Sequence, residues 1–136
     1  MQTDSAQPAA GPRPLLVVDG ANVVGSVPDG WWRDRRGAAE RLRDRLVRVA
    51  AEGVPGVDGP LDVVLVVEGA ARGVGPVDGV RVESAPGSGD DHIVAVAARA
   101  APGQECVVVT ADRELRERVA AHGARSVGPR AVRGAG

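Results

Sequence analysis

The chain has 136 residues, a formal net charge of −1 and one cysteine, and all 17 of its basic residues are arginine. This length fits one domain with a substantial core, and a lone cysteine excludes internal disulfides and thiolate metal clusters. A chain with so little net charge is not a histone-like binder. A polyanionic partner would have to be held by local patches or by bridging metal ions.

The two ends of the chain lack core-forming residues. Residues 1–13 are polar and rich in Pro and Ala, and residues 129–136 are similarly poor in large apolar side chains. We therefore expect a disordered leader (1–13), one domain (14–128) and a flexible tail (129–136). No segment looks like a signal peptide or approaches the roughly 18 apolar residues of a membrane span, so we expect a cytoplasmic protein that does not enter a membrane.

Three continuous apolar runs, at 15–18, 61–67 and 106–109, are typical of strands buried on both faces of a parallel sheet. Weaker runs at 80–82 and 125–127 could add edge strands. Helical periodicity covers 33–52, about 90–101 and about 113–122. Strands that alternate with helices predict an α/β sandwich, and we expect the strand at 15–18 to be central, with the other two long runs as its parallel neighbours.

The only aromatic residues, Trp31 and Trp32, stand just before the first long helix. Two rings leave almost no material for stacking platforms that bind bases. We expect them to cover the start of that helix, although they could stack on a base near the mouth of a site.

Acidic residues follow all three long apolar runs. Asp19 ends the first run in "LLVVDGANVV", Glu68 ends the second, and Asp112 follows the third. A tight turn explains one such event, because Asp, Gly and Asn all tolerate turn geometry, but it does not explain three. Ligands of parallel sheets bind beyond the carboxyl ends of the strands, and neighbouring strands lie only about 4.8 Å apart there.

A second acidic pair, Asp90 and Asp91, opens the helix at about 90–101 from the same edge of the sheet. Asp90 and Asp112 could each serve simply as helix caps. However, four or five carboxylates gathered at one edge repel each other and raise each other's pKa values unless a cation neutralises them. The pattern therefore predicts a Mg²⁺ or Mn²⁺ site. Arg113, next to Asp112, could bind a phosphate, and Glu68 is a further substrate-binding candidate.

The segments "LLVVDGANV", "GDDHIV" and "VVVTADREL" resemble the successive motifs of NYN domains, which are PIN-like metal-dependent ribonucleases. The resemblance covers about residues 15–127. It implies a PIN-like three-layer sandwich with a mainly parallel sheet of about five strands, and hydrolysis of RNA phosphodiester bonds. Many relatives carry an aromatic residue where Ala21 stands, an Asp in place of Glu68 and an Ala in place of Gly89.

The resemblance also assigns roles to individual positions. It implies catalytic roles for Asp19, Asn22, Asp90 and Asp112, and metal binding by Asp19, Asp90, Asp91 and Asp112. His92, which follows the acidic pair, is expected to be structural or exposed.

These observations predict a ribonuclease that uses Mg²⁺ or Mn²⁺ to cleave single-stranded or structured RNA, with a homodimer as a candidate assembly. The alternative is a catalytically silent PIN-like module that binds RNA or a nucleotide. A phospho-acceptor receiver domain would also have an acidic pocket, but it normally needs a lysine, and this chain has none.

Overall fold

The computed structural model describes residues 12–133 and contains a five-stranded sheet in the order β5-β4-β1-β6-β7. All four strand pairs of this sheet are parallel. Its strands are β1 (Leu15–Asp19), β4 (Asp62–Val67), β5 (Val80–Ser84), β6 (Cys106–Val109) and β7 (Arg125–Val127). The predicted parallel sheet is confirmed, and β1 is central, with β4 and β6 as its neighbours.

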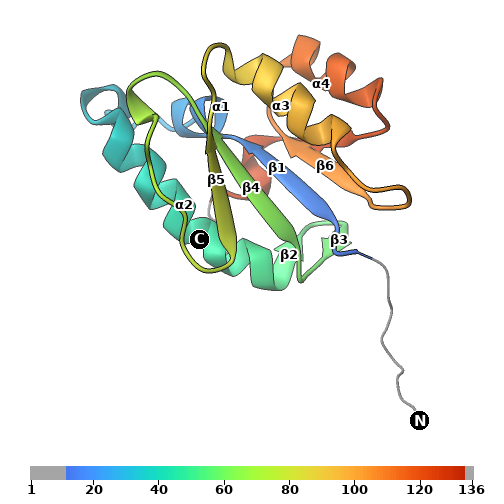
Figure 1. Ribbon diagram of the computed structural model, residues 1–136. Coiled ribbons are helices and arrows are strands. Elements are labelled where there is room, and N and C mark those ends of the chain that lie inside the picture. The colour runs from blue at the N-terminus through green and yellow to red at the C-terminus, as the bar shows by residue number, and fades with distance from the viewer. Residues whose placement is uncertain (1–11, 134–136) are drawn as a thin grey trace.

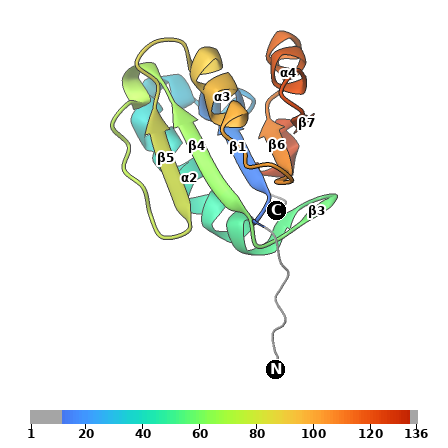
Figure 2. The same ribbon diagram turned by 45° about the vertical axis from the view of Figure 1, so that its right-hand side comes forward.

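Helices cover both faces of the sheet. Figures 1 and 2 show α2 (Arg35–Glu52) on one side, and α3 (Gly89–Ala98) and α4 (Arg113–Ala120) on the other. The arrangement is a three-layer α/β sandwich. The shorter elements are α1 (Gly20–Gly25), the 3-10 turns η1 (Trp31–Arg33), η2 (Gly69–Ala71) and η3 (Pro129–Ala131), and the hairpin of β2 (Gly53–Val54) and β3 (Val57–Asp58).

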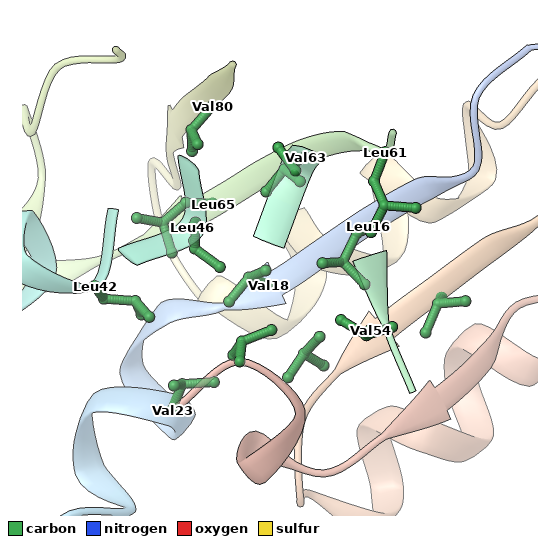
Figure 3. Close-up of a cluster of buried hydrophobic side chains, with 14 of the residues drawn as sticks. Leu16, Val18, Val23, Leu42, Leu46, Val54, Leu61, Val63, Leu65 and Val80 are labelled. Carbon is green, nitrogen blue, oxygen red and sulfur yellow. The ribbon is translucent and has the colours of Figure 1, made fainter. Parts of the chain in front are cut away.

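The alternating side chains of β1 divide the core into two layers. Leu16 and Val18 pack with α2 residues such as Leu42 and Leu46 (Figure 3), whereas Leu15 and Val17 pack toward α3 and α4. Each layer excludes water from one face of the sheet, which is why the strands are apolar throughout. Burial on both faces makes β1 a rigid support for Asp19, the residue at its end.

Several boundaries differ from the sequence prediction. The first long helix begins at residue 35, because Asp34 caps it by accepting a hydrogen bond from the Gly37 amide. The helix expected to reach about 101 ends at Ala98. The chain also continues in an ordered form past the predicted boundary at 128, since Val132 is buried against the α2 side of the sheet. The remaining tail residues, 134–136, and leader residues 1–11 lie outside the described residues.

The order of the strands creates a switch point between β1 and β6. From β1 the chain proceeds to β4 and β5 on one side, and it then crosses to β6 and β7 on the other. In open parallel sheets, ligands bind at such a point, beyond the carboxyl ends of the strands. We call this side of the molecule the carboxyl edge. Within residues 12–133, none of the helices has both the length and the apolar character that crossing a membrane requires.

Candidate metal centre at the carboxyl edge

Asp19 is a buried acid at the end of the central strand. Only 6% of its surface is exposed. Its Oδ1 accepts a hydrogen bond from the backbone amide of Asn22 at 3.3 Å, which caps α1, and its Oδ2 accepts one from the Thr110 hydroxyl at 2.9 Å. Among the described residues, no arginine or histidine pairs with it. The carboxylate of Asp19 is therefore buried and hydrogen-bonded, but it is not paired with a positively charged side chain of the described residues.

Three further acids approach Asp19 from other segments, as predicted. Glu68 follows β4, Asp90 lies in the first turn of α3, and Asp112 caps α4 after β6. We refer to these three with Asp19 as the acid cluster.

The pKa values reflect this gathering. Burial raises the pKa of Asp19 to about 6, with hydrogen bonds from Thr110 and Asn22 lowering it and the charges of Asp90 and Glu68 raising it. The pKa of Asp90 is also raised, first by burial and then by the charges of Asp112 and Glu68. The expected mutual repulsion is present.

Thr110 connects the acids and was missed in the sequence analysis. Its side chain is fully buried; the hydroxyl donates to Asp19 Oδ2 and accepts a hydrogen bond from the Asp112 amide at 3.2 Å. The hydroxyl thus holds the end of β1 against the turn that follows β6. The sequence signal was a single hydroxyl at the end of the valine run 107–109, directly before the acid segment.

Asn22 connects the same two segments from the other side. Its side-chain oxygen accepts a hydrogen bond from the Ala111 amide at 2.9 Å. This bond leaves the amide NH₂ of Asn22, a neutral double donor, without a bond to another described residue. The structure therefore brings Asn22 to the carboxyl edge next to Asp19, as predicted.

Glu68 has a structural role that the sequence did not reveal. Its Oε1 accepts a hydrogen bond at 2.7 Å from the amide of Gly89, the first residue of α3. The alternative role of Asp90 as a helix cap is wrong, since the Ser88 side chain caps this helix. The carboxylate of Asp90 therefore does not cap the helix, and Glu68 holds the helix end on which Asp90 lies.

Two further predicted candidates are exposed residues at the starts of α3 and α4. Asp91 is exposed, and it forms an ion pair with Arg118 of α4 at 2.9 Å. Arg113 is exposed at the start of α4, beside Asp112, with no ion pair to another described residue. His92 contacts Glu83 at 2.7 Å, away from the four acids, in keeping with a structural role.

The donor set fits a hard cation in chemistry, since it consists of carboxylate oxygens without His or Cys. Asp90 makes no side-chain hydrogen bond to the described residues, and one oxygen each of Glu68 and Asp112 is likewise unused. Within the described part of the chain, however, no three acidic, His or Cys side chains already stand close enough to hold a metal ion.

The sequence matches none of the protein-family models and none of the curated proteins with which it was compared. Its structure is similar to the crystal structure of a mutant of Rae1 (YacP) from Bacillus subtilis, with a TM-score of 0.63 and 20% sequence identity. The alignment covers 86% of this chain and 70% of that one. At this identity the similarity concerns the fold: the chain has a PIN-like α/β fold, in line with the resemblance to NYN domains.

Proposed function

We propose that this protein is a ribonuclease that hydrolyses RNA phosphodiester bonds with a Mg²⁺ or Mn²⁺ ion held by Asp19, Asp90 and Asp112. The observation that carries the proposal is the buried carboxylate of Asp19, which sits at the switch point of the sheet with acids around it and no arginine or histidine of residues 12–133 paired with it. Buried charges are normally paired or bound to metals. A divalent cation would relieve the burial and the repulsion together.

A bound Mg²⁺ or Mn²⁺ would neutralise charge on the phosphate and favour deprotonation of an attacking water. The protein's own groups have separate tasks. Thr110 and the Asn22 amide hydrogen-bond to Asp19 and favour its ionised form. The free NH₂ of Asn22 can donate to a phosphate oxygen without adding negative charge. Arg113, exposed beside Asp112, would bind a phosphate next to the one that is cleaved.

The test is to incubate the purified protein with labelled single-stranded and hairpin RNAs in Mn²⁺, Mg²⁺ or EDTA. We expect cleavage with either metal and none with EDTA. Ala at position 19, 90 or 112 should abolish cleavage, and double replacements should cost little more, because ligands of one ion act as a unit. The matched control is Asp78→Ala, an exposed acid before β5 and therefore at the opposite edge of the sheet.

A second candidate function is a PIN-like module that binds RNA without cleaving it. One observation favours it: no three potential ligands among residues 12–133 are already gathered for a metal. Calorimetric titration of Mn²⁺ separates the two candidates. Binding of Mn²⁺ by the parent but not by Asp19→Ala, together with cleavage, supports the nuclease. RNA binding without product and without Mn²⁺ binding supports the silent module.

A further inference from the structure

We propose that Trp31, Trp32, Arg33 and Arg35 form a platform on which a base of single-stranded RNA stacks beside the acid cluster. We call these four residues the Trp–Arg platform. The inference rests on the proposed function for its choice of RNA, and it goes beyond it by assigning a substrate-binding surface.

The platform contains every aromatic ring of the chain. The two rings meet edge to face, with centroids 6.0 Å apart and planes at 88°. The Arg35 guanidinium lies over Trp31, 5.0 Å from its centroid, and that of Arg33 lies 5.8 Å from the centroid of Trp32. Aromatic rings with arginine alongside are the usual elements of surfaces that bind single strands.

Coverage of the first long helix, the role expected from the sequence, does not account for Trp32. Trp32 is 54% exposed and belongs to neither layer of the core. Trp31 is better covered, because one edge of its ring faces Gly25 of α1. Trp31 thus anchors the turn, whereas Trp32 presents an open ring to solvent.

The charges of the platform favour an anionic partner. Of the arginines farther along α2, Arg36, Arg43 and Arg48 each form an ion pair with a carboxylate, whereas Arg41 and Arg45 form none with the described residues. Arg33 and Arg35 pair with no carboxylate of the described residues, since the intervening Asp34 caps α2. Arg33 beside the open ring of Trp32 and Arg35 beside Trp31 suit a nucleotide, which offers a flat base and a phosphate.

The platform adjoins the acid cluster. It lies between α1 and α2, at the upper left of Figure 1. Trp31 and Arg35 line a small pocket of about 70 Å³ together with Ala21 and Glu68. Since Glu68 acts on the pKa values of Asp19 and Asp90, one side of this pocket belongs to the acid cluster. The pocket is far smaller than the roughly 300–1,000 Å³ of sites that enclose a drug-sized ligand. The pocket can admit the edge of one base, while the rest of the RNA strand lies across the protein surface.

The experiment uses the tryptophans as reporters, because no other aromatic residue contributes fluorescence. A twelve-nucleotide oligo(U) is titrated into the full chain in EDTA, with fluorescence quenching and the anisotropy of labelled RNA as readouts. We expect quenching in the parent, and about tenfold weaker binding in Trp32→Leu. Arg33→Gln should reduce the slope of log affinity against log salt by about one. Val47→Ala, which alters an exposed apolar residue on α2 outside the platform, is the matched control and should bind like the parent.

Two comparisons decide what binds. If base-free polyphosphate quenches and binds as well as oligo(U), the surface is a general anion patch and the proposal is overturned. It is also overturned if Trp32→Leu binds RNA with parental affinity or if the parent does not bind RNA, and a peptide partner would then become the better occupant.

Failure of this inference can be told apart from failure of the proposed function. The fluorescence readout needs no metal and no cleavage. Trp32-dependent binding in a parent that never cleaves RNA supports the platform and refutes the nuclease. Conversely, a parent that cleaves RNA while Trp32→Leu binds and cleaves equally well refutes the platform alone.

Discussion

Replacing Asp19 by Asn tests whether the buried, ionised carboxylate lowers the stability of the fold. The folded-state pKa of Asp19 is about 6, against 3.8 for an ordinary aspartate. The difference of about 2 pKa units corresponds to about 3 kcal/mol. Asn matches the protonated acid in shape and caps a helix equally well. It therefore removes the charge without removing the cap.

The sign of the effect follows from proton linkage. The raised pKa means that the native state holds the proton more tightly than the unfolded state does. The stability that depends on protonated Asp19 is complete below about pH 4, and it is lost as the pH rises through about 6. Without metal, Asp19→Asn should therefore match the parent near pH 4 and exceed its free energy of unfolding by about 2–3 kcal/mol at pH 8.

The measurement is urea unfolding, followed by tryptophan fluorescence in EDTA at pH 4, 6 and 8. The control is Asp29→Asn, which alters an exposed acid. Its difference from the parent in unfolding free energy should be the same at all three pH values. Millimolar Mn²⁺ at pH 8 should stabilise the parent and not Asp19→Asn, because a ligand that binds only the native state stabilises it. Equal destabilisation of Asp19→Asn at pH 4 and pH 8 would refute the reasoning and make Asp19 an ordinary structural residue.

Three further outcomes are expected. Thr110→Val removes the hydroxyl that bonds to Asp19 and Asp112, so it should lower the unfolding free energy by about 1–3 kcal/mol. The loss should be larger at pH 8 than at pH 4, and an equal loss at both pH values would contradict the bond to ionised Asp19. Gly89→Ala should destabilise the parent by about 1 kcal/mol but stabilise the Glu68→Ala variant. A double-mutant cycle measures this reversal of sign, and its absence would refute the pairing of Glu68 with Gly89. Arg113→Ala should weaken RNA binding and its dependence on salt while Mn²⁺ titrations stay parental, and a change in Mn²⁺ affinity would argue against a phosphate role.

The sequence predicted the sheet well because its strands are buried on both faces. Continuous valine runs cannot form surface helices, so their positions were nearly unambiguous. The helix α1 was missed because six residues are too few to show a period. The hairpin β2–β3 lies in a Gly-rich segment with no alternating apolar pattern, so no periodicity marks its two strands.

The candidate site was predicted in outline and not in detail. Acids at strand ends had to meet at the carboxyl edge, because all the strands are parallel. Neighbouring residues at a helix start, however, point in directions about 100° apart. Sequence alone could not tell that Asp90 faces Asp19 while Asp91 faces Arg118. Thr110 was missed because a hydroxyl at the end of a strand has no distinctive pattern until its partners are known.

The departures from the NYN pattern at Glu68 and Gly89 become intelligible as a pair. Glutamate is one methylene longer than aspartate, and here it reaches the amide of Gly89. A β-carbon on residue 89 would overlap Oε1 of Glu68, so the longer acid requires the smaller neighbour. Because Asp90 is the next residue, the Glu68–Gly89 bond sets how closely α3 brings that acid to Asp19. Glu68 thus holds the start of α3, the helix that carries Asp90.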